Sequence, residues 1–133
     1  MSPEPADHPR ILVIDDDDVV RQLLEAICCE HGWNVVTAAT RDDAILAAGL
    51  HRIDLVLLDF NLDDTDALTV IPELRLVCPK TPIVVITGRA PEEVRGGVKR
   101  AGGNAVIGKP CSVENMRALL DCYRDSSAAE LSA

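Results

Sequence analysis

The sequence is poor in aromatic and basic residues, and both shortages restrict what the protein can be. Only Trp33, Phe60 and Tyr123 are aromatic among 133 residues, so the core has to be built from Val, Ile, Leu and Ala. Lys and Arg number 13 against 22 Asp and Glu, which gives a net charge of -9 and an isoelectric point near 4.6. Proteins that grip nucleic-acid phosphates need clustered basic side chains. The charge therefore argues against nucleic acid as a partner.

Sequence signals for membranes, export, disulfides and zinc are also missing. No apolar run approaches the ~20 residues of a membrane span, and the first ten residues, MSPEPADHPR, lack the apolar core of a secretory signal. We therefore expect a cytoplasmic protein with no membrane partner. The five cysteines are odd in number and form no Cys-x-x-Cys pair, which argues against a disulfide framework and a zinc site. We expect the cysteines to be small buried apolar side chains.

Short apolar runs alternate with amphipathic segments along the chain, and the runs span residues 11–14, 35–38, 54–58, 83–86 and 104–107. Four of the runs are apolar almost throughout, which is typical of strands covered on both faces of a parallel sheet. A helical segment follows each run. The pattern predicts an α/β protein of (βα)5 type with a doubly wound, five-stranded parallel sheet.

The length fits one domain, which we place at residues 10–124. Residues 1–9 hold three prolines and mostly polar residues, and we expect them to be a disordered arm. Residues 125–133, DSSAAELSA, are expected to be a flexible tail or the start of a linker.

Several helical segments carry signals for their ends or their buried faces. The first shows an apolar stripe at i, i+3 and i+4 spacing, made of Val19, Val20, Leu23, Leu24, Ile27 and Cys28. Thr40 followed by Asp43 predicts a capping box at the second, and Pro91 before two glutamates predicts the start of the fourth. The third is ambiguous because Pro72 falls inside the stretch 67–77, so this helix either starts late or bends there.

Polar residues stand where the predicted strands end, namely Asp15, Asp16, Asp59, Thr87, Gly88, Lys109 and Pro110. In a doubly wound sheet, ligands bind outside the carboxyl ends of the strands, so these residues should converge. Converging carboxylates repel one another at low dielectric, and both Lys109 and a hard divalent ion would offset that repulsion. Mg²⁺ prefers oxygen ligands. We expect Asp16 and Asp59 to bind it, with Asp15 assisting.

This set of groups suits phosphoryl transfer. The transition state spreads charge over the equatorial oxygens, so positioned cations supply most of the catalysis. An aspartate nucleophile would give an acyl phosphate, and Asp59 is the candidate. Mg²⁺, the Lys109 ammonium group and the Thr87 hydroxyl group would each bind one phosphoryl oxygen, and Gly88 would keep the approach uncrowded.

Residues 10–124 resemble the receiver domains of two-component response regulators. The pieces that carry the resemblance are ILVIDDDD, DLVLLDFNL, PIVVITG and VIGKP, in this order and with family-like spacing. The resemblance implies the flavodoxin-like strand order 2-1-3-4-5 and phosphoryl transfer to Asp59 from a histidine kinase or a histidine phosphotransfer protein. It also implies Mg²⁺ or Mn²⁺ as cofactor, a downstream protein or fused output domain as partner, and a monomer or weak dimer. Such a domain catalyses only its own phosphorylation and dephosphorylation.

At the metal site, the resemblance implies specific roles for four residues. Asp59 is similar to the family's phosphoacceptor, and Asp16 to the direct metal ligand that Asp15 assists. The backbone carbonyl group of Asn61, two residues after the acceptor, would be a further metal ligand.

On the phosphoryl side, Thr87 is similar to the hydroxyl residue that moves toward the phosphoryl group, and Lys109 to the phosphate-binding lysine. The family would make the Lys109–Pro110 bond cis. The chain departs from the family at Val106, where an aromatic switch residue often stands, and in NLDDTDAL, which lacks the usual Pro and Gly. A rotating aromatic side chain therefore cannot carry the signal here.

The segment PEEVRGGVKRAG predicts a loosely held helix. Each of its two adjacent glycines, Gly96 and Gly97, costs about 0.8–1 kcal/mol relative to Ala. Its apolar stripe consists only of Val94, Val98 and Ala101. We expect the surface around this helix to be mobile, to face a partner, and to become ordered on phosphorylation. The alternative is a surface helix that is merely frayed.

The residues leave two alternative functions. A haloacid-dehalogenase-like phosphatase also uses an aspartate nucleophile with Mg²⁺, but it needs a second aspartate where this chain has Asn61. The other alternative is a receiver-shaped interaction module that works without phosphorylation. The complete acidic set, together with Thr87 and Lys109, argues against that module.

Overall fold

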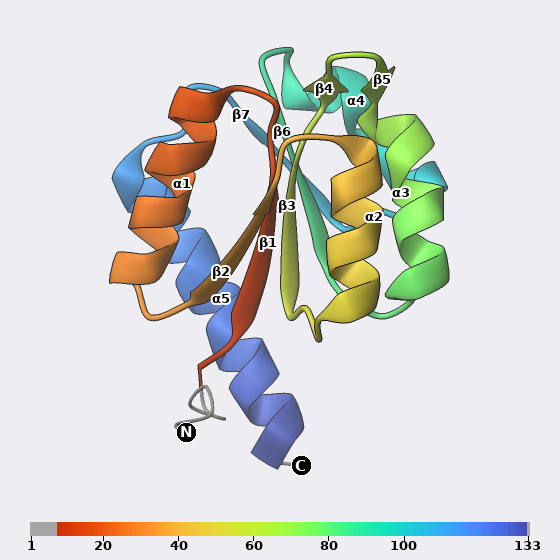
Figure 1. Ribbon diagram of the computed structural model, residues 1–133. Coiled ribbons are helices and arrows are strands. Elements are labelled where there is room, and N and C mark those ends of the chain that lie inside the picture. Colours follow the sequence, from red (N-terminus) through yellow and green to blue (C-terminus); the bar gives the residue numbers. More distant parts are fainter. Residues whose placement is uncertain (1–7, 133) are drawn as a thin grey trace.

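The computed structural model describes residues 8–132, with side chains described as far as Arg124, and shows a three-layer α/β fold (Figure 1). The central sheet consists of β1 (Arg10–Ile14), β2 (Asn34–Ala38), β3 (Leu55–Asp59), β6 (Ile83–Thr87) and β7 (Ala105–Gly108). All its strand pairs are parallel, and the order is β2-β1-β3-β6-β7. Counting only these five strands, the order is 2-1-3-4-5. The predicted fold is confirmed.

Helices cover both faces of the sheet (Figure 1). One face carries α1 (Asp18–Glu30) and α5 (Val113–Ser132), and the other carries α2 (Arg41–Leu50), α3 (Ala67–Val77) and α4 (Pro91–Ala101). Alternate residues of β1 point to the two faces of the sheet. Ile11 and Val13 pack with α1 and α5, and Leu12 and Ile14 pack with the other three helices. Burial on both faces explains why the strand is apolar throughout.

The faces and ends of two helices differ from the prediction. In α1, Val19 and Leu23 are 74% and 57% exposed, and Leu24 and Cys28 are the buried residues. The predicted stripe was too wide, because this helix contacts the sheet along a narrower row. Helix α3 begins at Ala67, so it does not start late at Pro72. Pro72 lies on the exposed side of the helix.

Side-chain caps explain where three helices start. Asp17 Oδ1 caps α1, and Thr40 Oγ1 accepts a hydrogen bond from Asp43 N at 3.1 Å at the start of α2. That bond is one half of the predicted capping box. Asp66 caps α3 by accepting a hydrogen bond from Thr69 N. Pro91 is the first residue of α4, as predicted.

Of the predicted terminal segments, residues 1–7 and residue 133 lie outside the described part of the chain. Within that part, Pro9 is buried, and its carbonyl oxygen accepts a hydrogen bond from Asn34 N at 2.9 Å. The folded region therefore begins before residue 10. Helix α5 continues to Ser132, past the predicted domain end at residue 124. The flexibility proposed for residues 1–9 and 125–133 stays a prediction.

The cysteines only partly follow the expectation of burial. Cys28 and Cys78 are buried, Cys111 is half-buried, and Cys29 and Cys122 are exposed. None of the five is in a disulfide within the part of the chain that the structure describes. Among the described residues, none of the helices has the length and apolar character to cross a membrane.

Candidate functional site

Asp59 is at the centre of the predicted site. It is the last residue of β3 and is buried, and the Lys109 ammonium group, in the loop after β7, donates a hydrogen bond to its Oδ1 at 3.0 Å. Asp15 and Asp16 follow β1. Each of Asp15, Asp16 and Asp59 places a carboxylate oxygen within 4.8 Å of the other two. The fold therefore brings these four sequence-predicted residues together.

Asp15 is held firmly by the backbone around it. Its N–H donates to the carbonyl oxygen of Ala38 at 3.1 Å, and its Oδ1 accepts from Asp17 N at 2.9 Å. Burial raises the pKa of Asp15 above its ordinary value, against the opposing effect of the Asp17 hydrogen bond; the charge of Asp59 raises that pKa further and Lys109 lowers it. Three carboxylates face one ammonium group. The cluster is therefore under-neutralised and suited to a cation.

The loop after Asp59 folds into a small hairpin that the sequence analysis missed. Strand β4 (Asn61–Leu62) pairs antiparallel with β5 (Thr65–Asp66). The turn carries Asp63, and a hydrogen bond with the Asp16 side chain raises the pKa of Asp63. The Asp63 side chain therefore approaches the acidic cluster. Asn61 is exposed at the start of the hairpin, and the metal role of its carbonyl group stays a prediction.

Thr87 and its neighbours lie at the ends of β6 and β7. Thr87 is fully buried, its Oγ1 accepts from Arg89 N at 3.0 Å, and its carbonyl oxygen accepts from Lys109 N at 2.7 Å. Gly88 is exposed, and a Cβ atom there would meet no atom within 4 Å, so this approach is uncrowded. The Lys109–Pro110 bond is cis, as the family resemblance implied.

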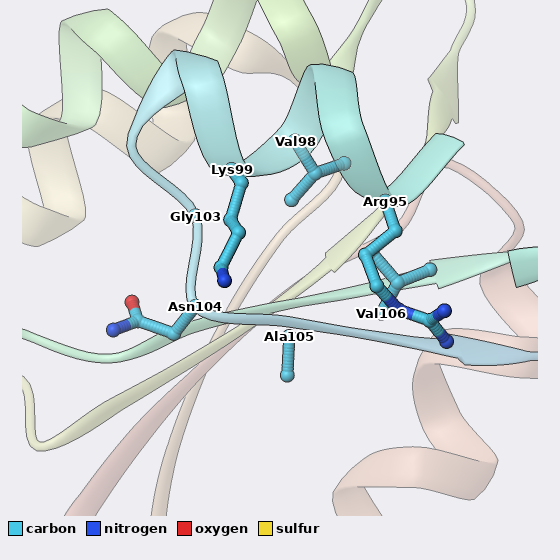
Figure 2. A pocket seen from close by; sticks show the side chains of 7 residues that line it. All are labelled: Arg95, Val98, Lys99, Gly103, Asn104, Ala105 and Val106. Atoms are coloured by element: carbon cyan, nitrogen blue, oxygen red, sulfur yellow. The ribbon is translucent and has the colours of Figure 1, made fainter. Parts of the chain in front are cut away.

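A separate pocket of about 240 Å³ lies between α4 and β7. Its lining consists of Arg95, Val98, Lys99, Gly103, Asn104, Ala105 and Val106. Figure 2 shows the Arg95 and Lys99 side chains reaching from α4 toward β7. Val106 is buried. The small side chain at this position thus borders a space flanked by two basic groups.

The acidic cluster fits a hard divalent cation. Its donors are carboxylate oxygens, the ligand type that Mg²⁺ and Mn²⁺ take, and three of them lie close enough to share one ion. A lysine beside the acceptor carboxylate and a buried hydroxyl group on the next strand complete the arrangement. Chemically, the site offers a carboxylate nucleophile with cationic and hydrogen-bonding groups around it.

Comparisons with known proteins agree with this geometry. The family model of the response regulator receiver domain matches residues 11–121. The probable transcriptional regulatory protein TcrX of Mycobacterium tuberculosis is 36% identical over 114 residues, which cover 83% of this chain and 49% of TcrX. The chain thus spans about half the length of this curated relative.

Two solved structures are similar in fold. A CheY-like receiver domain protein from Methanospirillum hungatei superposes with a TM-score of 0.84 at 24% identity, over 92% of this chain and 98% of that one. A response regulator protein from Burkholderia pseudomallei gives a TM-score of 0.78 at 28% identity, over 92% and 72% of the two chains. With the family model matching most of its length, the chain belongs to the response regulator receiver domain family and is a signal-transduction domain of the two-component type.

Proposed function

We propose that Asp59 accepts a phosphoryl group from a phosphohistidine donor in a histidine kinase or a histidine phosphotransfer protein. The observation that carries this proposal is the buried Asp59 carboxylate, bound by Lys109 at 3.0 Å and grouped with Asp15 and Asp16. The Burkholderia relative was solved with a phosphorylated aspartic acid and a calcium ion, which supports the same chemistry here.

In this reaction a carboxylate oxygen of Asp59 attacks phosphorus. A P–O bond forms, the P–N bond to the donor imidazole breaks, and the imidazole leaves with the electron pair. Lys109 Nζ, already bonded to Asp59 Oδ1, offsets the negative charge of the incoming group. The Thr87 hydroxyl group donates to a phosphoryl oxygen. Asp15, Asp16 and Asp59 would hold Mg²⁺ or Mn²⁺, whose positive charge stabilises the phosphoryl oxygens when the ion is bound.

Two surfaces suit the partners of this exchange. The first turns of α1, beside the acidic cluster, expose Val19 and Leu23, an apolar pair one turn apart that a donor protein can cover. The pocket between α4 and β7 lies on another part of the surface, where Arg95 and Lys99 flank it. We assign the α1 surface to the phosphoryl donor and the α4 surface to a downstream protein or output domain.

The family and the grouping of the site residues argue against both alternatives. A haloacid-dehalogenase-like phosphatase is not supported, because the matching family is the receiver domain. A module that works without phosphorylation is disfavoured, because the acceptor, the lysine and the acidic pair are all present and grouped. We therefore infer that the domain turns over only its own phosphoryl group and does not act on a separate substrate.

The experiment is phosphorylation by phosphoramidate, which carries a P–N bond, in the presence of Mg²⁺. Intact-mass spectrometry should show one added phosphoryl group on the wild type and none on Asp59→Asn. Asp43→Asn, which changes an exposed aspartate in α2, is the matched control and should label like the wild type. Undiminished labelling of Asp59→Asn would disprove the assignment of the phosphoacceptor. An unlabelled wild type would instead support a module that works without phosphorylation.

A further inference from the structure

Four consecutive aspartates follow β1, and the structure gives them two different tasks. Asp15 and Asp16 join Asp59 in the acidic cluster. Asp17 Oδ1 instead accepts hydrogen bonds from Val19 N at 2.9 Å and Val20 N at 3.1 Å, and Asp18 Oδ1 pairs with Arg21. Any of the four carboxylates is chemically able to bind a divalent cation. Some feature of the fold must therefore fix which two reach the site.

The Arg21 side chain contacts both the first and the last of these four aspartates. Its Nη1 donates to the backbone carbonyl oxygen of Asp15 at 2.8 Å, and its Nη2 donates to Asp18 Oδ1 at 2.5 Å. The Arg21 side chain is 18% exposed, whereas that of Asp18 is 76% exposed. A guanidinium group is planar and carries donors in a fixed fork. One side chain therefore ties the first aspartate of the run to the last.

We propose that Arg21 is a positioning residue that selects Asp15 and Asp16, over Asp17 and Asp18, as the carboxylates that face the cation. The inference rests on the metal binding of the proposed function. Asp15 is fixed on one side by its N–H bond to Ala38 and on the other by the bond from its carbonyl oxygen to Arg21. The same guanidinium group forms an ion pair with the Asp18 carboxylate, which is therefore not available to bind the cation.

Loss of Arg21 has two consequences for the loop. The carbonyl group of Asp15 loses its side-chain donor, so the backbone between β1 and α1 can shift. The Asp18 carboxylate loses its partner, because within the described residues its only ion pair is the one to Arg21. The Mg²⁺ affinity falls because the shifted loop holds Asp15 and Asp16 less firmly, and the freed Asp18 carboxylate then supplies part of the binding that remains.

The test is a double-mutant cycle on the full chain, with Mg²⁺ affinity measured by titration calorimetry. In the wild-type background, Asp18→Asn should leave the affinity unchanged within about twofold, the usual limit for independent sites. Arg21→Met should lower the affinity by about tenfold, the lower end of the effect of losing a residue that orients metal ligands. In the Arg21→Met background, Asp18→Asn should lower it by about threefold more, which makes the two positions coupled.

Thermal unfolding of the same variants separates positioning from a merely structural role. If Arg21 has only a structural role, Arg21→Met lowers the melting temperature but binds Mg²⁺ as tightly as the wild type. Asp18→Asn then leaves the Mg²⁺ affinity of that variant unchanged. That result, or an equal effect of Asp18→Asn in both backgrounds, overturns the inference. If Arg21→Met fails to fold, the same double-mutant cycle is measured with Arg21→Lys. A lysine keeps the positive charge but lacks the fixed pair of donors with which the guanidinium group contacts both Asp15 and Asp18.

The failure of the proposed function would look different. If Asp16→Asn binds Mg²⁺ as tightly as the wild type, or the wild type does not bind it, the metal site itself is wrong. If Asp16→Asn abolishes binding and Arg21→Met does not weaken it, only the role of Arg21 is wrong.

Discussion

Replacing Lys109 with methionine tests the charge balance of the site most directly. The change removes the ammonium group but keeps most of the apolar stem. At the observed 3.0 Å between Lys109 Nζ and Asp59 Oδ1, two unit charges attract by about 5.5 kcal/mol at an effective dielectric of 20. Lost hydration offsets much of this attraction, and the lysine side chain is 36% exposed, which screens it further. We expect the metal-free variant to lose about 1–2 kcal/mol of unfolding free energy, more than an exposed pair contributes.

Magnesium should reverse part of this loss. Lys109 repels a second cation beside Asp59, so its removal leaves three carboxylates that bind Mg²⁺ more tightly. Ligand binding adds RT ln(1 + [L]/Kd) to the stability of the folded state, and the lower Kd of the variant makes this gain larger than in the wild type. The difference in stability between the two proteins should therefore shrink as Mg²⁺ is raised. Phosphoryl uptake should nevertheless be slower, because the lysine no longer neutralises the incoming group.

Urea unfolding followed by circular dichroism, with and without Mg²⁺, measures this difference. Lys80→Met is the matched control, since Lys80 is exposed and has no ion pair in the part of the chain that the structure describes. The reasoning is refuted if the stability deficit of Lys109→Met is independent of Mg²⁺, or if the variant takes up phosphoryl groups at the wild-type rate.

Three further predictions concern stability and mobility. Because burial raises the pKa of Asp15, its charged form destabilises the metal-free fold at neutral pH. Asp15→Asn should therefore raise the melting temperature at pH 7. This gain should disappear as the pH falls to 3.8, the ordinary pKa of an aspartate side chain. Gly96→Ala should stabilise the protein in urea by about 0.8–1 kcal/mol, and Gly97→Ala by clearly less, because its Cβ atom would lie 3.3 Å from Leu68 Cδ2; equal gains would contradict this packing. Beryllofluoride should slow amide hydrogen exchange in residues 88–101, and unchanged exchange there beside protection elsewhere would refute ordering of α4.

The strands and the site were predictable because each rests on a local signal. Burial on both faces leaves a continuous apolar run in the sequence, and the observed strand boundaries differ from the predicted ones by one residue. The first polar residue after such a run is at the carboxyl edge of the sheet, which is how Asp15, Asp59 and Thr87 were found. Their convergence then follows from the parallel topology.

The features that were missed depend on contacts distant in sequence or on loop geometry. The apolar spacing of α1 did not reveal that Val19 and Leu23 stay exposed, because the width of a helix contact is set by the packing partner. The approach of Asp63 to Asp16 depends on the hairpin formed by β4 and β5, whose turn has none of the usual glycine signals. Gly97 was interpreted only as a weakness of α4, but its small size also allows close approach of Leu68 from α3.

The backbone after β6 offers a route for the signal that does not need an aromatic side chain at position 106. Thr87 Oγ1 accepts a hydrogen bond from Arg89 N, and Arg89 is two residues before Pro91, where α4 begins. If the hydroxyl group turns toward a phosphoryl oxygen, it changes the partner of that backbone N–H, and the connection to α4 has to adjust. Val106 is buried beside the pocket between α4 and β7, so the adjustment meets no large side chain there. We therefore expect a shift at the start of α4, and not a rotation at Val106, to carry the signal.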